Sequence, residues 1–229
     1  MMAPTCLLTA TLALGVAQGV PAGPSGDDPF AARPESAALS WDLLGGGVPD
    51  GGALLRAELG FSRLLEAGVE VPVVDGFLMG ATIGIDVGHF TPSNVDFGDG
   101  VDGALVFGLT GRYRLVHDSE WTIGLRAGLL GSAQLGRAGG GVRVPLRVSA
   151  LYAIDRTFLL GAMVDAPIRL EFPARLDAIF SFPLVVGLAA EFHLLPSLAL
   201  TAMAGLGPAL DTRGVETAFR GQIGVGYRL

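Results

Sequence analysis

The chain has 229 residues, of which 50% are hydrophobic and only 16% are charged, and it contains 35 glycines. Its mean hydropathy of +0.53 is too high for an ordinary soluble domain, in which roughly a quarter of the residues are charged. All 15 basic residues are arginine, the net charge is −7, and no basic run occurs, so the composition argues against a nucleic-acid partner.

Helical membrane spans do not account for this hydropathy. Beyond the N-terminus, no uninterrupted apolar run reaches the roughly 18 residues that a spanning helix needs. The nearest approach is residues 194–210 (LLPSLALTAMAGLGPAL), which contain two prolines and two glycines. Both residue types interrupt helices, so we expect the chain to use another kind of secondary structure.

The first 22 residues resemble a secretory signal peptide. An apolar core is followed by small residues, with candidate cleavage sites in residues 17–19 and 20–22, although no Lys or Arg precedes the core. The single cysteine, Cys6, lies in this segment, so a cleaved chain would need no disulfide. Residues 23–52 are rich in Pro, Gly and Asp and are predicted to be a flexible N-terminal segment, with a plug or short helix around residues 37–44 as an alternative.

From residue 53 onward the hydropathy alternates with a period of two, which is typical of β-strands with two different faces. In residues 77–89, for example, Phe77 and Ile83 alternate with Thr82 and Asp86. Ten strands are predicted, at residues 53–61, 65–73, 77–89, 104–116, 121–135, 142–154, 158–172, 179–194, 198–210 and 217–229. Most of them reach the 9–11 residues that a tilted strand needs to cross a bilayer. Merging or dropping the short first two would leave eight.

The position of the charges decides which face is outside. A soluble barrel also alternates, but its polar row faces bulk water and usually carries more and longer charged side chains. Here the apolar rows carry no charge, and the opposite rows alternate Gly, Thr and Ser with occasional Arg or Glu, as a narrow polar lumen would. The sequence therefore predicts an all-β, antiparallel, up-and-down transmembrane β-barrel in residues 53–229.

The charges on the inward rows are expected to pair, because an unpaired charge in a confined space is costly. Such a network would either close the interior or line a thin water-filled path. The predicted lumen charge network consists of Arg56, Glu58, Asp86, Arg112, Arg114, Arg126, Arg143, Arg147, Asp165, Glu191 and Arg220. The inward rows also hold Glu66, Glu70, Arg169, Glu171 and Arg228.

The connections between strands and the aromatic residues predict the orientation. Tight links near residues 74–76, 117–120, 155–157 and 196–197 alternate with longer ones, as periplasmic turns alternate with extracellular loops in such barrels. Residues 23–52 would then lie on the periplasmic side. Aromatic side chains on the apolar face lie close to the tight links, as in an interfacial girdle. The predicted girdle consists of Tyr113, Trp121, Tyr152, Phe158, Phe192 and Tyr227.

On these features, residues 53–229 and the signal segment resemble the small outer-membrane β-barrel proteins of Gram-negative bacteria. Val225, Tyr227 and Leu229 are similar to that family's C-terminal assembly signal, although the family most often ends in Phe. The resemblance implies a location in the outer membrane, with its lipid and lipopolysaccharide as surroundings. It also implies recognition of the chain by the barrel-assembly machinery.

Specific chemistry has weaker support in the sequence. His89 lies near Asp86 and Ser93, but closeness in sequence does not supply the hydrogen bonds that a catalytic set needs. Asp96, Asp99 and Asp102 are weak calcium candidates, and their spacing is not that of an EF-hand. We therefore expect no cofactor, no metal and no enzymatic activity.

The expected function is a structural or surface-interaction role in the cell envelope. One alternative is a narrow channel for small solutes through the lumen lined by Arg and Glu. Another is a barrel enzyme with His89 near the outer rim.

Overall fold

The computed structural model describes residues 41–45, 52–60, 64–87, 103–118, 120–135, 139–173, 178–212 and 214–229. Within these ranges the chain is all β. The strands are β1 (Leu54–Gly60), β2 (Leu64–Val74), β3 (Phe77–Val87), β4 (Gly103–His117), β5 (Trp121–Gln134), β6 (Gly139–Val144), β7 (Leu146–Ala153), β8 (Phe158–Asp165), β9 (Ile168–Pro173), β10 (Ile179–Pro183), β11 (Val185–Leu195), β12 (Leu198–Asp211) and β13 (Gly214–Arg228). No helix in these ranges is long and apolar enough to cross a membrane.

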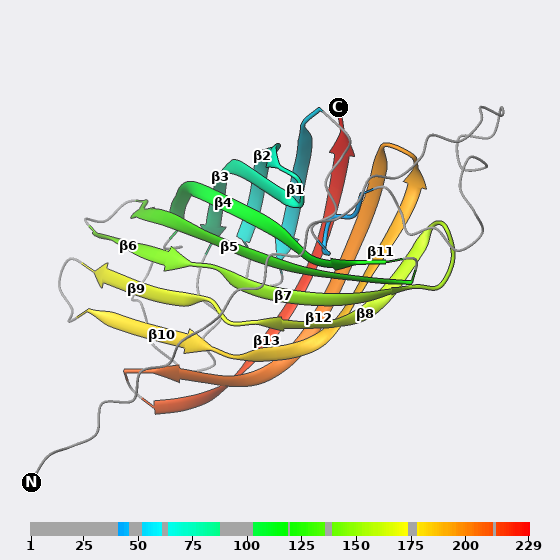
Figure 1. The fold of residues 1–229 in the computed structure, drawn as a ribbon. Coiled ribbons are helices and arrows are strands. Elements are labelled where there is room, and N and C mark those ends of the chain that lie inside the picture. The colour runs from blue at the N-terminus through cyan, green and yellow to red at the C-terminus, as the bar shows by residue number, and fades with distance from the viewer. Residues whose placement is uncertain are drawn as a thin grey trace, which may run out of the picture. The chain divides into compact units, whose positions relative to one another are not determined.

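The strands form one antiparallel sheet that closes on itself. β13 pairs with β1 over the whole length of β1, from Leu54 opposite Arg228 to Gly60 opposite Gln222. Figure 1 shows β13, in red, beside β1. The pairs β6 and β7, β8 and β9, and β10 and β11 are each one long strand with a single interruption, so the ring has ten strands. The predicted fold class and strand number are confirmed, and the alternative of eight strands falls away.

Three of the ten wall strands are interrupted, although the alternation predicts each of them as unbroken. They are the strands predicted at residues 142–154, 158–172 and 179–194, and the prediction was wrong in this detail. The breaks fall at Pro145, at Ala166 and Pro167, and at Leu184 directly after Pro183. Proline has no backbone N–H to donate, so each proline interrupts the hydrogen-bonded ladder. Neighbouring amides still join the strands across two breaks, because Ala166 N–H donates to Leu146 O and Leu184 N–H to Pro208 O, both at 2.8 Å.

Short turns gather at one end of the barrel, which we call the short-turn end. They connect β2 to β3, β4 to β5, β7 to β8 and β11 to β12, and β13 ends beside the start of β1 at the same end. Asp118 and Asp155 fix two of these turns by accepting backbone hydrogen bonds. The amide of Trp121, and after it that of Glu120, lowers the pKa of the Asp118 carboxyl, and the amide of Thr157 does the same for Asp155.

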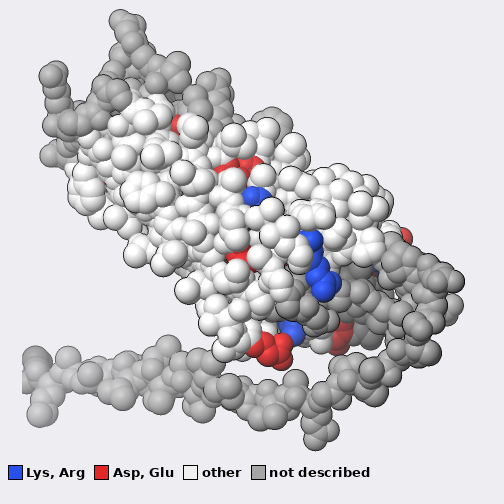
Figure 2. Space-filling view, turned by 90° about the horizontal axis from the view of Figure 1, so that it is seen from above, with Lys and Arg blue, Asp and Glu red and all other residues white. Residues whose placement is uncertain are grey.

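The two faces of the wall differ as the alternation predicts. On the outside, Ile83 and Leu188 are 57% and 68% exposed, whereas Thr82 and Asp86 on the inside are 4% and 6% exposed. On the face shown in Figure 2, uncharged residues cover most of the described surface, and charged side chains appear only in small groups. A closed ring with an apolar exterior satisfies the bilayer's demand that every backbone polar group be paired.

One part of the interior is apolar, which the alternation did not predict. It is built by inward-facing residues of β7, β8, β11 and β12, where both rows of each strand are apolar in places. Its buried wall residues are Leu151, Leu159, Met163, Val185, Ala189 and Met203. The lumen therefore has a charged side and an apolar side.

Candidate functional site

Residues 41–45, which we call the inserted segment, lie inside the barrel at its short-turn end. All five are buried, and Trp41 and Asp42 are each only 1% exposed. The indole N–H of Trp41 donates to the carbonyl of Pro196, in the turn between β11 and β12, at 2.8 Å. Residues 41–44 of the segment fall within residues 37–44, where a plug or short helix was the alternative prediction, and the segment obstructs this end of the lumen.

The backbone amides of the inserted segment bind one carboxylate. Leu43 N–H donates to Oε1 and Oε2 of Glu191 at 2.7 and 2.9 Å, and Leu44 N–H donates to Oε2 at 2.9 Å. Glu191 is 0% exposed, and its Oε1 also lies 2.9 Å from Nε2 of His193. A buried carboxylate requires such donors, so Glu191 depends on the segment as much as the segment depends on Glu191.

The backbone carbonyls of the segment bind other parts of the wall. Arg112 on β4 donates from Nη1 to the carbonyl of Leu43, and Ser149 on β7 donates to the carbonyl of Leu44 at 2.5 Å. On β5, between these two strands, the Thr122 hydroxyl donates to Oδ2 of Asp42 at 3.1 Å. Residues from β4, β5, β7 and β11 therefore hold the segment from several directions.

The side chains of the segment fill apolar space. Leu44 joins the buried cluster that includes Leu151 and Met163, and Leu43 packs in a second cluster with Trp41, Leu54 and Ala199. The Trp41 ring stands edge-on to His193, with ring centroids 5.0 Å apart. Burial of a Leu or a Trp side chain contributes on the order of 2 kcal/mol, so these contacts add materially to the hydrogen bonds.

Above the inserted segment, ion pairs join neighbouring strands and also cross the bore. Arg56 on β1 contacts Glu70 at 2.8 Å and Glu66 at 2.6 Å, both on β2. Arg126 on β5 reaches Glu58 on β1 at 2.9 Å and Glu66 at 2.5 Å. Three strands lie between β1 and β5 in the ring, so the Arg126 pairs span the lumen.

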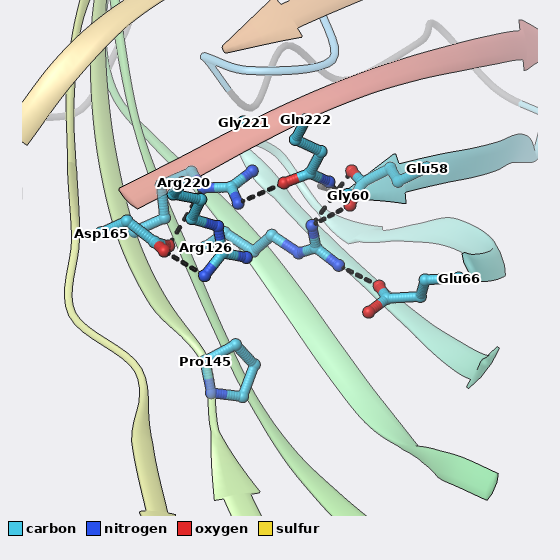
Figure 3. A pocket seen from close by; sticks show the side chains of 10 residues that line it. Glu58, Gly60, Glu66, Arg126, Pro145, Asp165, Arg220, Gly221 and Gln222 are labelled. Atoms are coloured by element: carbon cyan, nitrogen blue, oxygen red, sulfur yellow. Dashed lines mark hydrogen bonds and ion pairs between the residues drawn. The ribbon is translucent and has the colours of Figure 1, made fainter. Parts of the chain in front are cut away.

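A second group of pairs continues the network around the lumen. Arg143 contacts Asp86 at 2.6 Å, and Arg147 contacts Asp165 at 3.2 Å and donates to Gln222 at 2.9 Å. Arg220 also pairs with Asp165. Figure 3 shows Arg126 between Glu58 and Glu66, with Gln222 beside Glu58.

A small polar cavity lies among these groups. It offers about 40 Å³ to the centres of water-sized molecules, which is enough for a few waters. Its charged and amide-bearing lining residues are Glu58, Glu66, Arg126, Arg147, Asp165, Arg220 and Gln222. The lumen in this state is therefore closed by charged side chains at mid-height and by the inserted segment below.

The structure places most of the predicted network residues in the lumen, with two differences. Glu191 binds the inserted segment and His193 rather than an arginine. Arg114 lies at the short-turn end and pairs with Asp75 at 3.2 Å, because a turn brings this acidic residue closer than any lumenal carboxylate. Glu66 and Glu70, which the alternation placed on the inward rows, also pair within the network. Thr82 and Gln222 bind it too, although neither was predicted to do so.

The six predicted girdle aromatics lie on the outer surface near the short turns. Tyr113, Trp121, Tyr152, Phe192 and Tyr227 are between 39% and 45% exposed. The Trp121 and Tyr152 rings meet edge to face at 5.2 Å, and Phe158 lies 6.4 Å from Phe192. Val225 and Leu229 share the outward row of β13 with Tyr227. The roles of these residues as a girdle and as an assembly signal stay predictions.

The other candidate residues are not placed. His89, Asp96, Asp99 and Asp102 lie outside the described residues. Among the residues that are described, no group of three or more His, Cys, Asp or Glu could hold a metal ion.

No family model matches the chain, and no curated protein matches it either. Solved structures do. An outer membrane channel from Pseudomonas putida F1 matches with a TM-score of 0.51 and 10% identity, over 80% of this chain and 97% of that one. The outer membrane protease OmpT from Escherichia coli matches with a TM-score of 0.40 and 11% identity, over 78% of this chain and 94% of that one. A loop-deletion mutant of OmpT, an outer membrane protein of Vibrio cholerae, matches with a TM-score of 0.39 and 16% identity, over 79% of this chain and 60% of that one.

The chain has the fold of the small outer-membrane β-barrel proteins, as its sequence predicts. This fold agrees with the predicted location in the outer membrane. The expectation that the chain has no enzymatic activity is corrected, because a barrel fold of this kind does not exclude an enzyme.

Proposed function

We propose that the protein is a narrow outer-membrane channel for small polar solutes, closed in the state that the structure describes. The observation that carries this proposal is the way the lumen is closed. At the short-turn end the obstruction is a segment that is not one of the ten wall strands, held by hydrogen bonds and apolar contacts. The similar barrel from Pseudomonas putida F1 is an outer membrane channel, which agrees with this reading.

The charged lining indicates the class of solute. The inward rows of β1 to β3 carry four acidic residues (Glu58, Glu66, Glu70 and Asp86) and one basic residue, Arg56. Those of β4 to β7 carry four basic residues (Arg112, Arg126, Arg143 and Arg147). Opposite charges on neighbouring parts of a narrow wall favour small polar solutes over apolar ones. The polar cavity beside Arg126 lies on this path, above the inserted segment.

A purely structural barrel is the second candidate. The pairs that Arg126 makes with Glu58 and Glu66 cross the bore and would close it even without the inserted segment. A barrel closed by these ion pairs would act as a rigid component of the envelope whose loops are exposed at the membrane surface.

Conductance across planar bilayers separates the two candidates. The Arg126→Ala/Leu44→Asp double variant removes the cross-lumen pairs and places a carboxylate in the apolar pocket of the inserted segment. The channel proposal expects currents well above those of the wild-type protein, with a cation preference because Glu58 and Glu66 lose one of their two arginine partners and only Arg56 remains. Arg114→Ala is the control, since Arg114 pairs with Asp75 at the short-turn end and takes no part in the pairs that Arg126 makes across the lumen. A double variant that inserts but conducts no more than a protein-free bilayer would leave the structural role.

A further inference from the structure

We propose that the short-turn half of the lumen is a peptide-binding site, and that the inserted segment occupies it as a ligand carried by the same chain. This site does not depend on whether the barrel conducts. Its proposed ligand class is an extended peptide with an aromatic residue, an acidic residue, two leucine-like residues and a glycine in that order.

The wall recognises the main chain of the segment. Glu191 accepts from the two consecutive amides of Leu43 and Leu44, while Arg112 and Ser149 donate to the carbonyls of the same two residues. Amides and carbonyls are present in any peptide, so these four contacts would form with a separate chain as well as with a tethered one. Recognition of an extended main chain by fixed donors and acceptors is a recurring way to bind peptides.

The side chains of the wall supply the sequence preference. The buried cluster around Met163 takes the Leu44 side chain, and the His193 ring together with the Pro196 carbonyl takes the Trp41 indole. At Gly45 an added β-carbon would lie 2.6 Å from both Asp42 Oδ1 and the Thr122 side chain. The fifth position of the ligand therefore favours glycine over residues with a side chain. The pocket therefore distinguishes positions along the ligand rather than accepting any apolar segment.

The energetics of the empty site also favour a ligand with amide donors. Glu191 is 0% exposed, and without the inserted segment it would lose the amides of Leu43 and Leu44 and keep only the contact with His193 among these three. A buried carboxylate that loses hydrogen bonds is strongly destabilised. An emptied barrel would therefore take up water or another peptide at this position.

The tether explains why the site is occupied at rest. A segment joined to its own binding site has an effective concentration on the order of 1 mM, so a free peptide at micromolar concentration competes poorly with it. Binding in trans is consequently expected only when the segment is weakened. Two changes within the segment do this without altering the wall. Leu44→Asp places a charge in the apolar pocket, and Gly45→Val places a bulky side chain where even a β-carbon is crowded.

The test is the fluorescence anisotropy of a labelled peptide with the sequence of residues 41–46, added to the full-length chain folded in detergent. We expect saturable binding to the Leu44→Asp and Gly45→Val chains, at least tenfold tighter than to the wild-type chain. Adding Glu191→Gln to either variant should weaken binding at least tenfold, because one acceptor oxygen is lost.

The controls separate a site from adsorption to detergent. A peptide of the same composition in scrambled order should not bind, and neither should one with the Leu44→Asp change. Equal binding of the native and scrambled peptides, or equal binding to the wild-type and emptied barrels, would overturn the proposal. So would the absence of binding to both emptied barrels when each shows the faster migration of a folded barrel on an unboiled gel. None of these outcomes depends on conductance, so the channel proposal can fail while this one holds.

Discussion

The backbone amide of Leu43 donates to both carboxylate oxygens of Glu191, at 2.7 and 2.9 Å, across a sequence separation of 148 residues. Glu191 belongs to the wall and Leu43 to the inserted segment, so this contact joins two elements that no strand pairing connects within the described residues. The alternation predicted that Glu191 faces the lumen, but it did not predict that this carboxylate would be fully buried against the inserted segment. Glu191 is therefore one of the main wall residues that hold the inserted segment, together with Arg112 and Ser149.

Replacing Glu191 with Gln should loosen the inserted segment. Gln keeps the shape but loses the charge and one acceptor, and hydrogen bonds to charged groups contribute about 1.5–3 kcal/mol each. Trp41 should then become accessible. With Trp121→Phe as background, Trp41 is the only tryptophan, because the chain has two. The expected result is a red-shifted emission and stronger acrylamide quenching.

Glu216→Gln is the matched control for this experiment. Glu216 lies on β13 near the long-loop end and makes none of the contacts described for the inserted segment. Its removal should leave Trp41 emission unchanged. If Glu191→Gln also left emission and quenching at the wild-type values, Glu191 would not be what holds the segment.

Arg56→Ala should destabilise the barrel more than any single rim substitution. The side chain is 2% exposed and contacts Glu66 at 2.6 Å, Glu70 at 2.8 Å and Glu58 at 3.4 Å. Its loss would leave three carboxylates near one another with one cation fewer, and breaking a buried pair in this way costs about 3–5 kcal/mol. The measurement is the free energy of unfolding in guanidinium from lipid vesicles.

The comparison for Arg56 is Arg114→Ala. Its partner, Asp75, has a side chain that is 84% exposed, and exposed pairs contribute about 0–1 kcal/mol. Comparable losses of unfolding free energy in the two variants would show that the lumenal pairs add little beyond a surface pair.

Gly161→Ala should impair closure of the barrel. A β-carbon at this inward position would lie 1.9 Å from the carbonyl oxygen of Ala150 on the neighbouring strand, which is backbone and cannot rotate away. Overpacking of this kind costs about 1–3 kcal/mol or more. The readout is the fraction of protein that migrates faster on SDS gels when it is not boiled.

Gly131→Ala tests whether any added methyl group has this effect. Gly131 lies on β5, and its added β-carbon would be 3.5 Å from the Phe107 ring, an ordinary contact distance. It should fold like the wild type. A Gly131 variant that loses as much of the faster-migrating form as the Gly161 variant would refute the steric explanation.

The wall of this barrel could be predicted from the sequence because each strand repeats one simple rule. Outward positions such as Ile83 and Leu188 meet lipid, so every second residue is apolar, and the pattern extends over most of the chain. The strand breaks were missed because Pro145 and Pro167 fall on inward positions, where they do not disturb the alternation of hydropathy.

The contents of the lumen could not be predicted in the same way. Pairs such as Arg126 with Glu58 join strands that are far apart in the ring, so their formation depends on the bore and stagger of the closed barrel. The inserted segment gave only a composition signal, a Trp-Asp-Leu-Leu run within a Gly-rich stretch. Its binding to Glu191 required a buried acceptor that alternation cannot distinguish from any other inward acid.

The last residue of the chain offers a test of how the barrel reaches its membrane. Leu229 is 62% exposed on the outward row of β13, and its amide donates to Ala53 O at 2.8 Å. Phe219 lies on the same row of the same strand, at the other end, and is 59% exposed. Leu229→Asp and Phe219→Asp therefore place the same charge on the same lipid-facing row at opposite ends.

If Leu229 belongs to an assembly signal, the two variants should fold equally in detergent but differ in cells. A charge near an interface costs only about 0–1 kcal/mol in a membrane barrel, so neither substitution should prevent folding in vitro. Recognition by the assembly machinery would be lost only in Leu229→Asp, and the heat-modifiable form in outer-membrane fractions should fall several-fold relative to Phe219→Asp. Equal amounts of the two variants in the membrane would show that the C-terminal residue acts only as part of the wall.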